Sequence, residues 1–406
     1  MYSATQFKQK ILLLYFCIPL AITACGSTIT IPIQTSTTAP THVSGNDTLL
    51  LTYHGHAEKN TYAFWSPDGK KILSFGAIDE QSADTTSTLE VWDARTGQTL
   101  WTYTPTDAKT GFSPYSVIWS PNSQFIAAST DTHAATTKTG ATVSVWDAQT
   151  GQIRWKKSYP FGIIPTAMIW SPNNKQIAIN TGSQCCPGKL GVEIIDANTG
   201  ASLAYNGKIQ STANIAWSPD SGSLASAHGQ IWHITTNQMT TLPYTTQSFD
   251  SVAWSPDGKF LLIGTQDAQV LDIRSGKTIC AIHDSAAFPG FLAWSADGRY
   301  GLLVDTTSAE AFNATDCSIA YRHDNSQQMP MHIYSQLSAQ WSPDTKFLAT
   351  IDSNSTTTVS IFTLASTKST SYTLPVLPNN ISWSPDSTMI ASACQDGNIY
   401  VSRIAA

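Results

Sequence analysis

One heptad recurs eight times along the chain, and no other feature restricts the fold as strongly. Residues 64–70 are FWSPDGK, and near-copies such as IWSPNSQ and AWSADGR follow at intervals of 37 to 54 residues. The tryptophans of the eight copies are Trp65, Trp119, Trp170, Trp217, Trp254, Trp294, Trp341 and Trp383. A period of this length indicates a chain built from stacked supersecondary units rather than from one continuous core.

Each copy of the heptad lies in a unit with four short apolar runs. Residues 251–282, SVAWSPDGKFLLIGTQDAQVLDIRSGKTICAI, place turn-forming residues between these runs, which predicts four short strands joined by tight turns. In the Ser-Pro-Asp-Gly turn, proline presets the first central residue and glycine accepts the left-handed conformation that follows. Asn174 replaces this glycine in one copy and Thr345 in another, and we expect local backbone strain at Thr345.

Units of four strands at this period predict an all-β chain that folds as a single β-propeller with four-stranded antiparallel blades. A blade exposes apolar faces on both sides and cannot stand alone. We therefore expect the repeated tryptophans to fill the seams between blades. Replacing one such buried tryptophan by alanine should cost about 3–5 kcal/mol of stability.

The two ends of the repeat array predict how the ring closes. The last unit, which contains Trp383, supplies three strands, whereas residues 49–56, LLLTYHGH, precede the first unit without inner strands of their own. We expect this N-terminal segment to form the outer strand of the last blade, which gives an eight-bladed ring and removes exposed sheet edges. Seven blades with one degenerate insertion is the alternative.

A second motif follows within the units. It is VWDARTGQ at residues 91–98 and VWDAQTGQ at 145–152, with weaker forms IIDANTG and VLDIRSGK further on. Trp-Asp at the end of a third strand, followed by a polar turn and an outer strand, resembles WD40 repeats over about residues 48–406. The resemblance implies the propeller fold and says almost nothing of function. The Gly-His pair that opens most WD40 repeats occurs in a fitting context only as Gly55-His56, so we expect the buried His-Ser-Asp-Trp network of that family to be missing from most blades.

The N-terminus has the parts of a secretory signal. Lys8 and Lys10 precede a short apolar run at residues 11–21, and small residues follow. The run is shorter than the 20 or so apolar residues of a transmembrane helix. Residues 22–25, ITAC, resemble the bacterial lipobox, which implies cleavage before Cys25 and a diacylglyceryl group on its sulfur. A plain secretory signal with a chance cysteine is the alternative.

These patterns divide the chain into three parts. Residues 1–24 are expected to be a lipoprotein signal peptide, residues 25–47 a lipidated cysteine with a Ser/Thr/Pro-rich tether, and residues 48–406 the propeller. Charged residues are 12% of the chain and the formal net charge is −6. A weakly charged, acidic chain without a basic patch suits an extracytoplasmic location and argues against nucleic acid as a partner.

The motifs of common enzymes are missing from the sequence. There is no Gly-x-Ser-x-Gly elbow, and the nine histidines show no zinc-ligand spacing, so we expect no catalytic residue, metal or cofactor. A propeller enzyme of the pyrroloquinoline-quinone type is the alternative. DARTGQTLW and DAQTGQIRW resemble the docking motif of those proteins, which implies that Trp101 and Trp155 pack against a neighbouring blade. The adjacent cysteines of CCPG, residues 185–188, resemble the vicinal pair that some of these enzymes place beside the cofactor.

Five cysteines follow the signal region, so at least one is unpaired within the chain. They are Cys185, Cys186, Cys280, Cys317 and Cys394. Cys280 and Cys317 fall on predicted outer strands of neighbouring blades. A bridge between them requires a Cα separation within about 7 Å, and we expect that they do not meet this distance.

Loops between second and third strands, together with the connections between blades, give the candidate partner surface. The connections at residues 77–88, 131–141 and 181–191 are longer than their equivalents in later units, and long loops on a rigid scaffold often carry binding residues. The candidate binding residues are Asp79, Glu80, Phe112, Tyr115, Asp131, His133, Tyr159, Phe161, Cys185 and Cys186. We expect a monomeric, non-enzymatic, lipid-anchored scaffold that binds an unidentified protein or small ligand. The alternative is that the loops are tolerated insertions with the aromatic side chains packed beneath them.

Overall fold

The structure of the protein is a computed structural model. It describes residues 41–42, 49–56, 61–76, 87–105, 110–132, 140–183, 190–209, 214–242, 251–264, 267–283, 291–304, 308–324, 339–352, 357–366 and 368–404. Within these ranges the regular elements are β-strands. No helix in this part of the chain is long and apolar enough to cross a membrane.

The strands form eight antiparallel sheets that we number as blades 1 to 8. Blades 1 to 4 comprise β3 (Thr61–Trp65), β4 (Lys71–Gly76), β5 (Leu89–Asp93) and β6 (Thr99–Tyr103); β7 (Thr110–Trp119), β8 (Phe125–Thr132), β9 (Thr142–Asp147) and β10 (Ile153–Ser158); β11 (Ile163–Trp170), β12 (Gln176–Ser183), β13 (Gly191–Asp196) and β14 (Ser202–Asn206); and β15 (Ile215–Trp217), β16 (Ser223–Ser226), β17 (Gln230–His233) and β18 (Gln238–Thr241).

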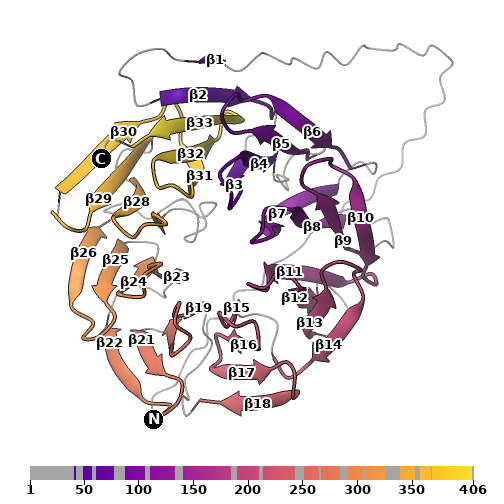
Figure 1. Ribbon diagram of the computed structural model, residues 1–406, viewed down its shortest axis with the longest axis vertical. Coiled ribbons are helices and arrows are strands. Elements are labelled where there is room, and N and C mark those ends of the chain that lie inside the picture. Colours follow the sequence, from indigo (N-terminus) through magenta and orange to yellow (C-terminus); the bar gives the residue numbers. More distant parts are fainter. Residues whose placement is uncertain are drawn as a thin grey trace, which may run out of the picture. The chain divides into compact units, whose positions relative to one another are not determined.

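Blades 5 to 8 repeat the same order of strands. They comprise β19 (Ser251–Trp254), β20 (Phe260–Gly264), β21 (Asp267–Asp272) and β22 (Thr278–His283); β23 (Phe291–Trp294), β24 (Tyr300–Val304), β25 (Ser308–Asn313) and β26 (Ile319–Asp324); β27 (Ala339–Trp341), β28 (Phe347–Asp352), β29 (Thr358–Thr363) and β30 (Lys368–Thr373); and β31 (Pro378–Trp383), β32 (Met389–Cys394), β33 (Asn398–Arg403) and β2 (Leu49–His54). The blades stand around a ring, with their first strands near the centre and their fourth strands at the rim (Figure 1).

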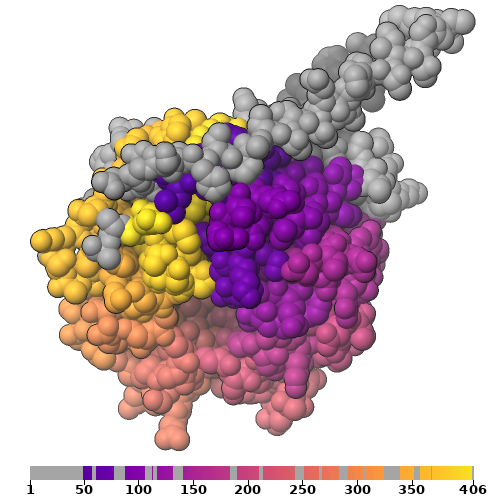
Figure 2. Space-filling view, turned by 45° about the horizontal axis from the view of Figure 1, so that its top comes forward, coloured from indigo at the N-terminus to yellow at the C-terminus, as the bar shows by residue number. Residues whose placement is uncertain are grey.

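The ring closes in the way that the sequence predicts. Strand β2 pairs antiparallel with β33, with Tyr53 opposite Ile399 and His54 opposite Asn398. Blade 8 therefore combines three C-terminal strands with one N-terminal strand, and the first and last blades lie side by side (Figure 2). The prediction of eight blades is confirmed, and the seven-bladed alternative is wrong. The two-residue strand β1 (Thr41–His42) pairs with the outer edge of β2, which adds a fifth strand to this blade.

The repeated tryptophans lie between neighbouring blades at the ends of the first strands. Five of them donate the indole N–H to a main-chain carbonyl of the preceding blade. The pairs are Trp119 to Phe64, Trp217 to Ile169, Trp254 to Ala216, Trp294 to Ala253 and Trp383 to Gln340, over 3.0–3.3 Å. In each pair the acceptor is the residue before the tryptophan of the preceding blade. The heptad therefore links each of these seams by a hydrogen bond as well as by apolar packing.

The turn that follows the tryptophan links neighbouring blades a second time where its fourth residue is serine or asparagine. Its fourth residue has a positive φ whether it is Gly69 (71°), Ser123 (61°) or Thr345 (63°), so the predicted strain at the β-branched Thr345 lies where left-handed backbone is required. The Oγ of Ser123 accepts a hydrogen bond from the backbone N–H of Asp68 in the preceding blade, over 2.9 Å. Serine at this position has a strained left-handed backbone, but its hydroxyl forms a hydrogen bond between blades that glycine cannot form.

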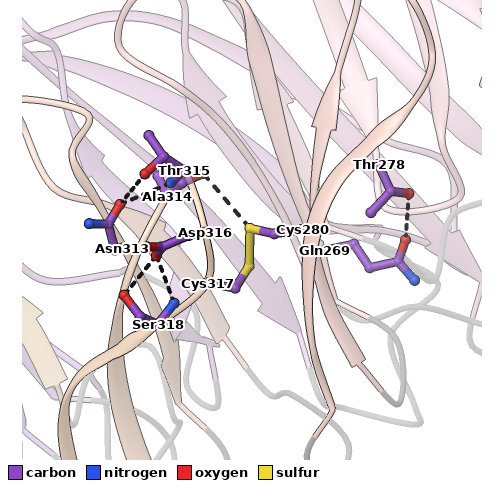
Figure 3. Close-up of a disulfide and its surroundings, with 9 residues drawn as sticks. All are labelled: Gln269, Thr278, Cys280, Asn313, Ala314, Thr315, Asp316, Cys317 and Ser318. Carbon is purple, nitrogen blue, oxygen red and sulfur yellow. Dashed lines mark hydrogen bonds between the residues drawn. A yellow bond between two sulfur atoms is a disulfide. The ribbon is translucent and has the colours of Figure 1, made fainter.

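The expectation that Cys280 and Cys317 stay apart is wrong. They form a disulfide with a Cα separation of 5.7 Å (Figure 3). Only Cys280 lies on an outer strand, β22, whereas Cys317 lies in the turn between β25 and β26. Because this turn faces the rim of the preceding blade, the two Cα atoms come close enough for the sulfur atoms to form a disulfide. Among the described cysteines, Cys394 is free and buried.

Candidate functional site

One end of the ring carries the connections from second to third strands and from each blade to the next. We call this end the loop face. Much of it lies outside the described residues, including Asp79, Glu80, His133, Cys185 and Cys186. The described part nevertheless shows a strong difference between blades, which concerns the length of their inner hairpins.

The inner hairpins of blades 2 and 3 are longer than those of blade 5. Strand β7 begins nine residues before its tryptophan and β11 begins seven before, whereas β19 begins three before. Their partners β8 and β12 have eight residues each, and β20 has five. At about 3.3 Å per residue, four additional residues extend a strand by about 13 Å. We call these two elongated elements the raised hairpins; they carry Tyr115 in β7 and Asp131 in β8.

Two of the aromatic candidates, Phe112 and Tyr159, are buried and contact the neighbouring blade. Phe112 is buried and meets the ring of Phe75 in blade 1 edge-on, at 6.1 Å between centroids. Tyr159 is also buried and donates its hydroxyl proton to Glu193 of blade 3 over 2.7 Å. Phe161, in contrast, is 49% exposed. Of these three side chains, Phe161 is therefore the one presented at the surface.

A hydrogen bond and an ion pair connect blade 2 to blade 3. Glu193 accepts from Tyr159 and also lies 3.0 Å from the Nζ of Lys157. Burial and the nearby Glu193 carboxylate raise the pKa of Tyr159 above its usual value, because both disfavour the phenolate. Tyr159 and Lys157 come from the chain of blade 2 and Glu193 from β13 of blade 3. This cluster therefore joins blade 2 to blade 3 by a hydrogen bond and an ion pair.

A second polar cluster lies where the ring closes. His56 contacts the Oγ of Ser74 over 2.8 Å and the Oγ1 of Thr88 over 3.0 Å. Trp92 donates its indole N–H to the same Ser74 hydroxyl. Tyr53 stacks on Trp92 with 4.5 Å between ring centroids. The only Gly-His pair in a fitting context thus forms a His-Ser-Trp network in blade 1.

Blade 2 shows what happens without that histidine. Ala128 occupies the place of Ser74, and the buried Nε1 of Trp146 has no hydrogen-bond partner among the described residues. The WD40-type network is therefore missing here, as the scarcity of Gly-His pairs predicts. In blade 1, Tyr53 donates its hydroxyl proton to the buried Glu90, so the closing segment joins the network from two positions.

The seam between blades 8 and 1 has polar contacts that sequence analysis missed. Asn380 accepts a hydrogen bond from the backbone N–H of Ala63 over 3.0 Å and donates one to its carbonyl over 2.8 Å. Asn379 donates to the Thr61 carbonyl, and Ser382 accepts from the Trp65 N–H. Two consecutive asparagines in an otherwise apolar first strand were the available signal. These side chains form hydrogen bonds between β31 of blade 8 and β3 of blade 1, two inner strands that belong to different sheets.

A cavity of about 500 Å³ lies at the centre of the ring, lined by the first strands of all eight blades. Its walls are mostly apolar, with amide and hydroxyl groups from Asn214, Ser251, Gln340 and Ser382. None of the lining residues is charged. Pyrroloquinoline quinone is a polycarboxylate anion and requires cationic partners, so the residues present here do not fit that cofactor. The described residues also contain no group of three potential metal ligands.

Comparison with known proteins agrees with the fold. Residues 237–271 and 368–401 match the family model for the WD domain, G-beta repeat. The match identifies WD40-type sequence in these two segments of the chain. Each matched segment begins at the outer strand of one blade and runs through the three inner strands of the next. The sequence repeat is thus offset from the structural blade by one strand, the same offset that closes the ring. No curated protein matches the chain.

Several solved structures share the architecture. The C-terminal WD40 domain of Sif2 superposes with a TM-score of 0.63 at 11% identity, covering 91% of this chain and 99% of that one. The Cps50 (Swd1) β-propeller domain of Myceliophteria thermophila gives 0.54 at 13% identity, covering 88% and 100%. A chain of the mitotic checkpoint complex gives 0.55 at 18% identity, covering 73% and 95%. Identities this low establish a common fold and no common partner.

Proposed function

We propose that this protein is a non-enzymatic scaffold, held at the outer surface of a bacterial cell membrane by a lipid on Cys25, that binds a protein partner through the raised hairpins. The observation that carries the proposal is the difference between blades on the loop face. Strands β7, β8, β11 and β12 extend further toward the loop face than the corresponding strands of blade 5. Long, rigidly supported elements are where binding residues concentrate on such scaffolds.

The fold and the cavity favour binding over catalysis. WD40 propellers commonly bind proteins, and one structural neighbour is a chain of a multiprotein complex. The central cavity has no charged lining residue, and general acid–base chemistry uses titratable side chains. Two tyrosine–glutamate pairs beside the loop face serve in contacts between blades: Tyr159 with Glu193 and Tyr53 with Glu90.

The disulfide supports an extracytoplasmic location. Disulfides form and persist in oxidising compartments and are rare in the cytosol, and Cys280 and Cys317 are paired. This agrees with the secretory signal pattern of residues 1–24 and with the low content of charged residues. A lipid on Cys25 would then hold the propeller at the membrane through the Ser/Thr/Pro-rich tether.

Cross-linking in source cells tests the binding proposal. The tagged protein is recovered beside a Phe161→Asp variant and a form in which the segments at residues 133–139 and 184–189 are shortened. Leu100→Asp is the matched control, because Leu100 is 39% exposed on the outer strand β6. We expect one set of partners to be lost from the two loop-face variants and retained by the control. Equal recovery from all forms would contradict binding at the raised hairpins.

Lipidation is tested separately. Cells fed an alkyne-bearing fatty acid should label the wild-type protein and leave a Cys25→Ala variant unlabelled. The labelled protein should be found in the membrane fraction and be digested by protease added to intact cells. Label retained in Cys25→Ala, or protection from the protease, would contradict the proposed anchor or the proposed location.

A further inference from the structure

Two tryptophans at the rim attach their blades to the next blade in the same way. Trp101, on the outer strand of blade 1, donates its indole N–H to the Ala148 carbonyl of blade 2 over 3.2 Å. Trp155, on the outer strand of blade 2, donates to the Ala197 carbonyl of blade 3 over 2.9 Å. Each tryptophan stands eight residues after the aspartate that opens its turn, and each follows a bulge in the outer strand. Bulges re-aim side chains, and here they direct the indole at the neighbouring blade.

A glycine in the receiving turn makes room for each indole. A Cβ at Gly151 would lie 2.7 Å from the ring of Trp101, and a Cβ at Gly200 would lie 2.7 Å from the ring of Trp155. Both glycines also have a positive φ, 71° and 73°, and stand four residues after the aspartate of their turn. The rim contact therefore has two parts: a large side chain on one blade and a residue without a side chain on the next.

The disulfide occupies both of these positions at another seam. Cys280 stands eight residues after Asp272 in blade 5, the place of the tryptophan, and also follows a bulge. Cys317 stands four residues after Asn313 in blade 6, the place of the glycine, and has a φ of 54°. The Sγ of Cys280 lies 3.8 Å from the Ala314 carbonyl oxygen, the equivalent of the carbonyl that accepts from the indole (Figure 3).

We infer that the Cys280–Cys317 disulfide is a covalent substitute for the tryptophan contact, so that the rim between blades 5 and 6 is the redox-sensitive joint of the ring. Reduction by a dithiol breaks the S–S bond, adds two electrons and two protons to give two thiols, and converts the dithiol to its disulfide. Two cysteines without the bond leave this seam without an indole to fill the rim. Both cysteines are partly exposed, so a reductant reaches them.

The loosening is confined to the rim because the inner part of the seam has its own contacts. Trp294 donates to the Ala253 carbonyl over 3.0 Å, and Ser251 accepts from the Leu292 N–H over 3.0 Å. Leu262, Leu292 and Leu303 are buried in the same seam. Reduction should therefore loosen the backbone hydrogen bonds of the outer strands β22 and β26 while the centre of the ring stays closed.

Amide hydrogen exchange of the folded, full-length protein tests the inference. On mild reduction with dithiothreitol, we expect exchange in β22 and β26 to accelerate at least tenfold, with β6 and β10 of the tryptophan-joined blades unchanged. Cys280→Ser/Cys317→Ser should show the fast exchange without reductant. Unchanged exchange in the reduced wild type, or equal acceleration in β6 and β10, would overturn the inference of a redox-sensitive rim.

A compensating double variant tests the equivalence itself. Cys280→Trp/Cys317→Gly converts the disulfide into the contact seen at Trp101 and Gly151. It should restore slow exchange in β22 and β26 and make it insensitive to dithiothreitol. Cys280→Trp alone is the matched control and should stay fast, because the Cβ of Cys317 occupies the space that the indole needs. Fast exchange in the double variant, or slow exchange in the control, would overturn the equivalence.

Discussion

Asn380 joins the last blade to the first through two hydrogen bonds with the main chain of Ala63. Its Oδ1 accepts from the Ala63 N–H over 3.0 Å, and its Nδ2 donates to the Ala63 carbonyl over 2.8 Å. Both residues have no exposed surface. Asn380→Leu keeps a side chain of similar size and removes both polar atoms, so the amide and the carbonyl of Ala63 lose their partners inside the protein.

The expected cost follows from the number of groups left without a partner. A buried donor or acceptor that loses its hydrogen bond costs about 1–3 kcal/mol. With two such groups, Asn380→Leu should lower the free energy of unfolding by about 2–6 kcal/mol. This is a large part of the 5–15 kcal/mol or so that stabilises a typical domain, so the variant should unfold at clearly lower urea concentration.

Urea unfolding followed by tryptophan fluorescence gives the free energy directly. Ser251→Ala is the matched control, because the Ser251 hydroxyl accepts one hydrogen bond from the Leu292 N–H at the seam of blades 5 and 6. We expect Asn380→Leu to lose about twice as much stability as Ser251→Ala, since two backbone groups are affected instead of one. An Asn380→Leu loss no larger than that of the control would refute the reasoning.

Three further predictions concern other contacts. Trp217→Ala, which removes a buried indole and its bond to the Ile169 carbonyl, should cost about 3–5 kcal/mol in urea unfolding; a cost below about 1 kcal/mol would contradict seam filling. Deleting residues 49–56 exposes the edge of β33 and should unfold or oligomerise the protein in light scattering, whereas a stable monomer with unchanged Tm would refute this closure. Tyr159→Phe should reduce the loss of stability that occurs as the pH rises. The raised pKa of Tyr159 keeps its hydroxyl protonated in the folded protein, so its contribution to stability is full below the unfolded pKa of about 10 and is lost as the pH rises above that value. An unchanged dependence of stability on alkaline pH would contradict this.

Residues that act locally were predictable from the sequence. The Ser-Pro-Asp-Gly turn depends on backbone preferences of four consecutive residues, so both its place and the left-handed conformation at Thr345 could be predicted. The number of blades and the closing strand followed from counting, because each blade repeats the same order of strands. The scarcity of Gly-His pairs also indicated correctly that the His-Ser-Trp network of blade 1 would not extend to blade 2.

Pairing between blades was harder to predict because it depends on three-dimensional proximity. The disulfide was missed because Cys317 was placed on a strand, whereas it lies in a turn that faces Cys280. The aromatic candidates Phe112 and Phe161 look alike in sequence, yet one is buried against blade 1 and the other is 49% exposed. Whether a side chain at the end of a strand points under or over a loop depends on the neighbouring blade.

The sequence by itself determined the propeller, since a repeated unit with apolar faces on both sides can bury them only against copies of itself. It also determined the closing strand, because that strand is what the last unit lacks. The sequence also placed tryptophans in the seams, but the tertiary structure alone decided which carbonyl each indole meets, the contacts of the adjacent Asn379 and Asn380, and the covalent bond at Cys280. The physical reason is that these partners lie 37 to 318 residues apart, and distances across a seam depend on the completed ring rather than on any local run of residues.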